Sequence, residues 1–470
     1  MDVALLLVPW VGAVVALLVS SDRMRPFVLV ATTLGHLGLS GALLALDVPP
    51  TTGWLALDPP ARLVLPLVSV VFAGASVYGV GYLRLRTRTT RVFVACLSAL
   101  LGTLTLAILA QHLGIMWVAI EGSALAAAPL IYFNRSPRSI EATWKYLLVG
   151  SVGVALALLG TFFLAYAALH AGVHSSLLFD DLAAVAPQLS APWVKAAFVL
   201  LLVGYGTKMG LAPMHAWKPD AYGEAPGLVG ALFAAGVTSA AFLAVLRVFR
   251  VVSLAGQGEV ASDMLVVLGL LSMGLAAAMM LGQRDIKRML AWSSVEHMGI
   301  LAVGTGVGGA ARYGALLHLL TNGVTKGVVF LSAANLHRAY GSKSSDVVTG
   351  ALRGVPVSGW LFLLGFFAVT GAPPFGPFLS ELTIVLGALS AGHALIAALF
   401  VAAIMVVFIG MAGTVLRVSF GEGGPTQWKD TALMSSPIVG FLLLSLWLGV
   451  AIPAPVDALI QATVAWLAVP

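Results

Sequence analysis

Long apolar stretches separated by short polar loops make up nearly all of this chain of 470 residues. Each stretch is about 20 residues long and lacks strict alternation, which is typical of bilayer-spanning helices and not of barrel strands. We therefore expect an all-α polytopic membrane protein, whose tail from Pro453 to Pro470 forms a short interfacial helix. The pattern predicts about fourteen spans, near residues 3–20, 26–46, 61–83, 91–110, 113–133, 146–169, 193–218, 226–250, 262–282, 290–308, 313–335, 357–390, 393–416 and 433–452.

Proline and glycine interrupt two of these spans. The span at 193–218 contains Pro213, and the span at 357–390 contains Pro373, Pro374 and Pro377. Proline lacks a backbone donor and clashes with the preceding turn, so each run should open at these residues. A break at membrane depth is tolerated only where it is buried in protein or lines a wet cavity. Both breaks are therefore expected at functional positions.

The two broken spans indicate an internal repeat. They are the seventh and the twelfth, five apart, which suggests two units of five spans. An odd number of spans per unit makes the two units inverted in the membrane, as in many transporters. We expect residues 1–90 to form the first three spans, 91–251 the first repeat, 261–417 the second repeat, and 418–470 the last span with the tail.

Composition and charge support a membrane protein and suggest its orientation. Only 9% of the residues are charged, whereas soluble proteins carry about 25%. Eighteen of the 25 Lys and Arg fall in loops of one face and five on the other, which leaves Lys208 and Lys326 inside spans. This bias places both termini outside the cytoplasm, and it explains the net charge of +6 without nucleic acid. The single cysteine, Cys96, excludes a disulfide framework and a cysteine-based metal site.

Glu121 and Lys208 are expected to form a buried pair. Glu121 lies in the middle of the fifth span, and Lys208 lies beside the break in the seventh. A charged group at the bilayer centre costs roughly 2.5–3.5 kcal/mol on insertion scales, so it normally faces the bundle interior and has a partner. A lysine whose carboxylate neighbour approaches or retreats can take up and release a proton. The alternative, a static ion pair that joins two helices, stays open.

A polar stripe is expected on the eleventh span. His318, Asn322 and Lys326 are spaced four apart, so they share one side of a helix. The tenth span adds His297 near the inner face, where a histidine that caps a helix end is an equally good interpretation. Glu381 follows the second break, and His215 lies within the first. Alternating carboxylates, lysines and imidazoles suggest a proton path and not a site for a bulky organic solute.

These residues resemble a known family. The segments IEGSALAAAPLIYF, KMGLAPMHAWKPDAYGEAP, QRDIKRMLAWSSVEHMG, LLHLLTNGVTKGVVFL and GAPPFGPFLSELTI are similar to those of antiporter-like proton-translocating subunits. Such subunits occur in respiratory complex I, Mrp-type cation/proton antiporters and membrane-bound hydrogenases. The run from Pro129 to Tyr166 looks most like component F of hydrogenase-4-type complexes.

The resemblance implies roles for individual residues. Glu121, Lys208, Lys326 and Glu381 match the ionisable residues of the family's relay, and His215, His297 and His318 are available between them. Where M-type subunits carry a lysine in the eighth span, this chain has Ser239, so the central relay would run through His318 and Lys326. We expect supporting roles for four further polar residues: Lys145, Asp220, Asn322 and Ser239.

The resemblance also implies partners. The chain would be a proton-translocating subunit in a bacterial or archaeal cell membrane, assembled with other membrane subunits and with peripheral redox subunits. Redox chemistry would occur in those partners, since this chain has no ligands for clusters, flavin or nickel, and we expect neither a cofactor nor a metal in it. Three alternatives stay open: an Mrp-type or self-standing Na+/H+ antiporter, a membrane partner in inorganic-carbon uptake, and a scaffold whose charges are only structural.

Overall fold

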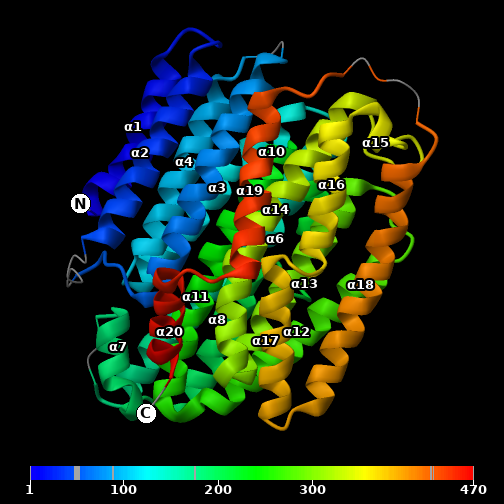
Figure 1. Ribbon diagram of the computed structural model, residues 1–470. Coiled ribbons are helices and arrows are strands. Elements are labelled where there is room, and N and C mark those ends of the chain that lie inside the picture. The colour runs from blue at the N-terminus through cyan, green and yellow to red at the C-terminus, as the bar shows by residue number, and fades with distance from the viewer. Residues whose placement is uncertain are drawn as a thin grey trace.

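The described residues form a bundle of long, nearly parallel helices (Figure 1). The computed structural model describes residues 2–46, 53–86, 89–173, 176–423, 426 and 428–468. Isolated bridges between loop segments pair Leu55 with Ala110, His112 with Leu178 and Asp285 with Ser344. The all-helical prediction is confirmed for this part of the chain.

The helices have the following bounds. The first half contains α1 (Asp2–Leu18), α2 (Arg25–Ala45), α3 (Pro59–Arg84), α4 (Arg91–Leu109), α5 (Leu113–Ile131), α6 (Pro137–His170), α7 (Phe179–Val185), α8 (Ala191–Met209), α9 (Trp217–Glu224), α10 (Gly227–Leu232) and α11 (Thr238–Val252). The second half contains α12 (Gly258–Met280), α13 (Ile286–Val307), α14 (Gly309–Tyr340), α15 (Ala351–Gly354), α16 (Pro356–Val369), α17 (Gly376–Ser390), α18 (Ala394–Phe420), α19 (Ala432–Val450) and α20 (Ala454–Leu467). Short 3-10 turns lie at Tyr132–Asn134 and Ala186–Gln188, and π-helical turns at Phe233–Val237 and Ser253–Gln257.

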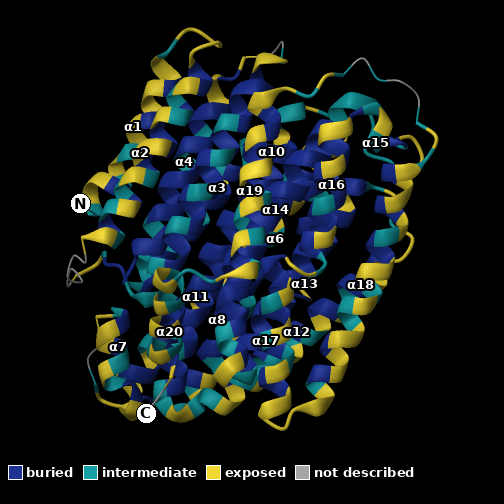
Figure 2. Ribbon diagram, viewed as in Figure 1, coloured by how far each residue is buried: buried dark blue, intermediate teal, exposed yellow. Residues whose placement is uncertain are grey.

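Length and composition make this a multi-pass integral membrane protein. Within the described residues, nine helical stretches are long and apolar enough to cross a bilayer. One of them, Gly227–Met280, comprises α10, α11 and α12, with a kink between α11 and α12 at Gly256, which has a φ of 72°. Exposed apolar side chains line the outward faces of α1 and α18, whereas the interior is buried (Figure 2). The finer count of fourteen spans stays a prediction.

Both proline-rich segments open the helical path. The chain leaves α8 at Met209, turns through residues 210–216, which include Pro213, and resumes as α9. It leaves α16 at Val369 and resumes as α17 at Gly376, with Pro373 and Pro374 in the turn. Pro377 does not lie in this turn. It is in the first turn of α17, where proline is favoured because its missing N–H has no helical partner to lose.

Four basic residues that the topology count assigned to loops are buried instead: Arg25, Lys218, Arg247 and Lys287. Arg247 lies in α11 and donates to both carboxylate oxygens of Asp58, at 2.7 and 3.0 Å, and to the carbonyls of Ala107 and Ile108. A buried charge persists only when it is paired and hydrogen-bonded, and Arg247 meets both conditions. Lys218 is fully buried in α9. Arg247 lies beside the end of a predicted span and Lys218 lies just after a break, so their positions in the sequence did not reveal this burial.

Candidate functional site

The expected pair of Glu121 and Lys208 lies between α5 and α8. Lys208 Nζ is 3.6 Å from Glu121 Oε2, which is within ion-pair range but longer than a hydrogen bond. Ser151 Oγ on α6 donates to Glu121 Oε1 at 3.1 Å. The Tyr146 ring, also on α6, lies 5.3 Å from Lys208 Nζ. Lys208 is 1% exposed, so the carboxylate and the aromatic face provide its electrostatic stabilisation.

The end of α8 is covered by the helix that follows it. The last carbonyls of a helix have no intrahelical donor, and the negative end of its dipole attracts cations. Trp217 Nε1 donates to the Thr207 carbonyl at 2.8 Å, and Lys218 Nζ donates to the Met209 carbonyl at 2.8 Å. Lys218 Nζ also donates to the Ser294 carbonyl of α13 at 3.1 Å. The break therefore ends in a buried cation that joins α8, α9 and α13.

The polar stripe on α14 is buried along its length. His318, Asn322 and Lys326 are each at most 2% exposed. Lys326 Nζ donates to Ser293 Oγ on α13 at 2.7 Å, and the carboxylates of Glu296 and Glu381 attract its charge. Four-residue spacing thus places the stripe on the side of α14 that faces α13 and α17.

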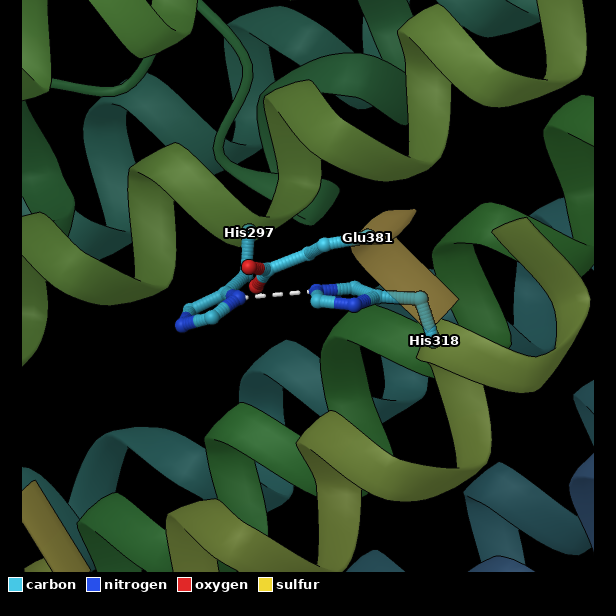
Figure 3. A group of neighbouring side chains, drawn as sticks. All are labelled: His297, His318 and Glu381. Carbon is cyan, nitrogen blue, oxygen red and sulfur yellow. Dashed lines mark hydrogen bonds between the residues drawn. The ribbon is translucent and has the colours of Figure 1, made fainter. Parts of the chain in front are cut away.

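His297, His318 and Glu381 meet between α13, α14 and α17 (Figure 3). His297 Nδ1 lies 2.8 Å from His318 Nε2, and His318 Nδ1 lies 2.8 Å from Ser380 Oγ. His297 is halfway along α13 and 1% exposed, deeper than the inner-face position expected for it. A histidine that caps a helix end is therefore excluded.

The same three residues have the composition of a metal site. One ligand atom from each lies within 4.8 Å of the others. However, two ring nitrogens 2.8 Å apart share one hydrogen, so one of them has no free lone pair for a metal. This arrangement suits a group that holds and passes protons better than one that holds a metal ion.

Glu381 lies against the second break. Gly371 has a φ of 67°, and a methyl group there would lie 2.2 Å from Glu381 Oε2. The first break repeats this relation, because Gly210 has a φ of 86° and a methyl group there would lie 2.5 Å from Lys218 Cδ. In both breaks only glycine fits the backbone conformation and leaves room for the charged side chain.

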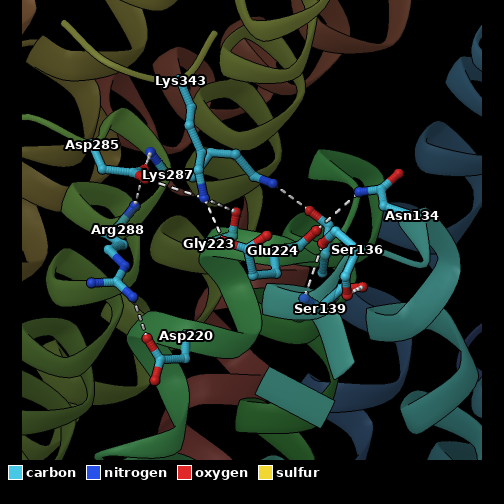
Figure 4. Close-up of polar contacts among 11 residues, drawn as sticks. Asn134, Ser136, Ser139, Asp220, Gly223, Glu224, Asp285, Lys287, Arg288 and Lys343 are labelled. Atoms are coloured by element: carbon cyan, nitrogen blue, oxygen red, sulfur yellow. Dashed lines mark hydrogen bonds and ion pairs between the residues drawn. The ribbon is translucent and has the colours of Figure 1, made fainter. Parts of the chain in front are cut away.

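A second polar network lies at the end of the bundle where α9 and α13 meet (Figure 4). Asp220 pairs with Lys145 at 2.8 Å and with Arg288 at 2.5 Å. Lys343 pairs with Glu224 at 2.7 Å and with Asp285 at 3.2 Å. The two supporting residues Lys145 and Asp220 therefore contact each other in this network. An open cavity of about 650 Å³ borders this network.

The other two expected residues, His215 and Ser239, are buried. His215 is 9% exposed in the first break, with its ring 5.4 Å from that of Trp292. Ser239 is buried in α11, directly after the π-helical turn. Sequence reasoning missed Lys218 as a buried group, and it missed Ser151, Ser293 and Ser380 as hydrogen-bond partners. The only available signal was a lysine so soon after a break in an apolar span.

The chain has two interrupted helices, with lysine and glutamate side chains buried near the breaks. Such an arrangement is typical of membrane proteins that carry ionisable groups inside the bilayer. The family model described as "NADH:quinone oxidoreductase/Mrp antiporter, TM" matches residues 110–407. The chain belongs to this family and is one of its antiporter-like membrane subunits. The resemblance drawn from the sequence is confirmed.

One relative and two solved structures are similar to this chain. The hydrogenase-4 component F homolog of Methylacidiphilum infernorum is 31% identical over 464 residues, which are 96% of each chain. A chain of the membrane-bound sulfane sulfur reductase, an archaeal respiratory membrane complex, superposes with a TM-score of 0.88 at 21% identity, over 99% of this chain and 97% of that one. A chain of the Mrp complex from Dietzia sp. DQ12-45-1b superposes with a TM-score of 0.87 at 19% identity, with the same coverage. The two superpositions establish the common fold.

Proposed function

We propose that this chain moves protons as a membrane subunit of a multisubunit respiratory complex of the hydrogenase-4 or complex I-related type. Protons would pass along a lateral row of four ionisable residues: Glu121, Lys208, Lys326 and Glu381. Redox chemistry in partner subunits would drive this movement. The similarity to a hydrogenase-4 component F homolog supports this type of complex.

The observation that carries this proposal is the burial of the row. Lys208 and Lys326 are at most 1% exposed, in a part of the chain where isolated charges are costly. Neither forms a tight, fully hydrogen-bonded pair with a carboxylate: Lys208 is 3.6 Å from Glu121, and Lys326 hydrogen-bonds a serine. Loose partners suit groups that exchange protons better than groups that only hold helices together. His297, His318 and Ser380 form a hydrogen-bonded chain beside Glu381.

We infer a fourteen-span architecture with two inverted repeats, at 91–251 and 261–417, flanked by residues 1–90 and 418–470. Helix packing supports it: α4 packs on α5 and α6 on α8 in the first unit, and α12 packs on α13 and α14 on α17 in the second. The break at Gly210 in the first unit corresponds to the break at Gly371 in the second. Each of these glycines has a positive φ and lies beside a charged side chain.

We also infer that the protein lies in a bacterial or archaeal cell membrane with both termini on the outer face. The excess of Lys and Arg in loops of one face supports this orientation. The network around Asp220, Glu224 and Lys343 would then face the cytoplasm.

A neighbouring membrane subunit would cover the face of α5 and α6 that carries Glu121. The Glu121 side chain is 23% exposed, and the surrounding side chains of Val118, Leu125, Leu148 and Val152 are all exposed. A carboxylate open to lipid is unfavourable. A protein partner would shield it and continue the relay.

The complex that co-purifies with a tagged copy of this chain in mild detergent provides the test. It would be reconstituted into proteoliposomes and driven by the electron donor of its redox subunits, with an internal pH dye as readout. Glu121→Ala and Lys208→Ala should abolish proton transport while part of the electron transfer remains. Ser332→Ala is the matched control, because Ser332 on α14 bonds only carbonyls of its own helix. Undiminished proton transport in the first two variants would refute the proposal.

The same preparation tests the alternative functions. Proton movement driven by a sodium gradient, without an electron donor, would identify an Mrp-type antiporter, whose chain shares this fold. Co-purification with a single large cytosolic partner and no redox subunits would favour inorganic-carbon uptake.

A further inference from the structure

Lys218 is a buried cation that the row described above does not include. It is 0% exposed, and its ammonium donates to two backbone carbonyls, those of Met209 and Ser294. Among the residues that the structure describes, no carboxylate lies within ion-pair distance of it. A carbonyl oxygen accepts a hydrogen from an ammonium and from a neutral amine alike, whereas a carboxylate partner strongly favours the charged form. Lys218 therefore differs from a lysine held in a salt bridge.

We propose that Lys218 is a further proton-binding site, placed between Lys208 and Lys326 in the relay. This inference rests on the proposed function and deepens it. A proton would leave the Lys208 ammonium and bind the neutral Lys218 amine, and Lys218 would pass it to the neutral Lys326 amine. One proton moves in each step, and each donor is left as a neutral amine.

The contacts of Lys218 lead toward both neighbours. The Met209 carbonyl belongs to the residue that follows Lys208 in the last turn of α8. The Ser294 carbonyl belongs to the residue that follows Ser293, whose hydroxyl accepts from Lys326. The α9 helix therefore places this cation where the two halves of the row meet.

The fold fixes the Lys218 side chain in this position. Its stem crosses Gly210, which leaves no room for any larger residue there. Glu381 crosses Gly371 in the second break in the same way, and Glu381 is a proposed member of the relay. Each break thus presents one ionisable side chain from the helix that follows it.

Lys218 also compensates for the lysine that M-type subunits carry in the eighth span, where this chain has Ser239. The resemblance implies a lysine in the eighth span, but this chain has a serine there, and a hydroxyl does not become a cation near neutral pH. Ser239 is buried and cannot replace an ammonium. Lys218 supplies the missing cation from the preceding broken helix.

An arginine at position 218 distinguishes a proton-binding role of Lys218 from a purely structural one. If Lys218 only caps the carbonyl end of α8, arginine would preserve the cap, because it keeps the charge and the donors. Arginine does not lose its proton in proteins, so it would block a relay. Lys218→Arg therefore separates the two roles, and Lys218→Met removes both.

The experiment uses the same reconstituted complex and measures proton transport together with electron transfer. Lys218→Arg and Lys218→Met should each lower proton transport at least roughly tenfold, with electron transfer partly retained. Ser332→Ala, the control on α14 used above, should leave transport unchanged. If Lys218→Met fails to assemble, Lys218→Arg decides alone. Normal transport in Lys218→Arg, with transport abolished in Lys208→Ala, would overturn the role of Lys218 only. Normal transport in Lys208→Ala would instead overturn the proposed function.

Discussion

Lys326 is the cation at the centre of the second half of the row. It is fully buried, hydrogen-bonds Ser293 at 2.7 Å and is attracted by both Glu296 and Glu381. A lysine between two carboxylates can bind to one as it leaves the other, which makes it a switch between them. Removing it would deprive both buried carboxylates of this cation.

Lys326→Met is therefore expected to lower proton transport roughly 10²-fold, the range for loss of a proton-transfer group. Methionine is unbranched and only one atom shorter than lysine, so packing around α14 should be retained. Transport would be measured in the reconstituted complex, beside the thermal unfolding temperature of the subunit. Ser332→Ala on the same helix controls for changes to α14. Transport equal to that of the unmodified complex would show that Lys326 is structural.

For single residues, the sequence predicted which side chains carry the chemistry, but it predicted fewer of their contacts. The adjacency of Glu121 and Lys208 followed from the cost of unpaired charge in the membrane, and the two lie 3.6 Å apart. The burial of Lys218 could not be predicted, because a polar segment after a break reads equally well as a loop. Only the fold shows that α9 packs against α13.

The two helix breaks are the elements that bring charged side chains into the bundle. Each has a left-handed glycine over which a charged side chain passes, Gly210 with Lys218 and Gly371 with Glu381. Proline and glycine patterns predicted where the helices open. They did not predict that Pro377 belongs to α17, or that π-helical turns flank α11. Such turns depend on tertiary packing and have no strong local signal.

Gly371→Ala is expected to impair both stability and transport. A non-glycine residue in the left-handed region costs about 1–2 kcal/mol, and the added methyl would lie 2.2 Å from Glu381 Oε2. Gly392→Ala is the matched control, since Gly392 has a φ of 81° but open space around it. The control should lower the unfolding temperature slightly and leave transport intact. Equal effects of the two substitutions on transport would show that the position of Glu381 does not matter.

A polar clip joins the loop between α1 and α2 to the start of α4. Asp22 Oδ1 accepts from the Thr90 backbone N–H at 2.8 Å and from Thr90 Oγ1 at 3.0 Å, and the carboxylate also pairs with Arg25. The Thr90 backbone hydrogen bond is the main reason why the pKa of Asp22 lies below its ordinary value of 3.8. Asp22 thus caps α4 from another loop.

A lowered pKa means that the clip contributes stability at every pH above 3.8 and loses it as the pH falls through the folded-state value. Asp22→Asn should therefore lower the unfolding temperature at neutral pH. The difference from the unmodified protein should shrink below pH 3.8, where the native carboxyl also becomes neutral. Thermal unfolding in detergent across this range measures it. A difference that stays constant with pH would mean that the charge of Asp22 plays no part.

The whole molecule presents one face that a lone membrane protein would not favour. Val118, Glu121 and Leu125 follow one side of α5, and Leu148 and Val152 follow one side of α6. The helices are joined here by the hydrogen bond from Ser151 to Glu121. Hydropathy reveals that such side chains are membrane-embedded, but it does not separate those that contact lipid from those that contact a partner. The partly exposed carboxylate makes that distinction.

If a second subunit covers this face, enlarging its apolar side chains should displace that subunit. Leu125→Trp and Val152→Trp are expected to reduce the yield of co-purified membrane subunits several-fold, because overpacking a close interface forces its parts to separate. Leu443→Trp on α19 is the control, since Leu443 is 58% exposed on another helix and a lipid-facing site accepts a larger apolar side chain. Subunit yield after affinity purification in mild detergent is the measurement, with the unfolding temperature of this chain as a check on its fold. Equal losses in all three variants would contradict a specific partner at Glu121. Loss confined to α5 and α6 would place the start of the relay at a subunit boundary, where a proton could pass between neighbouring chains.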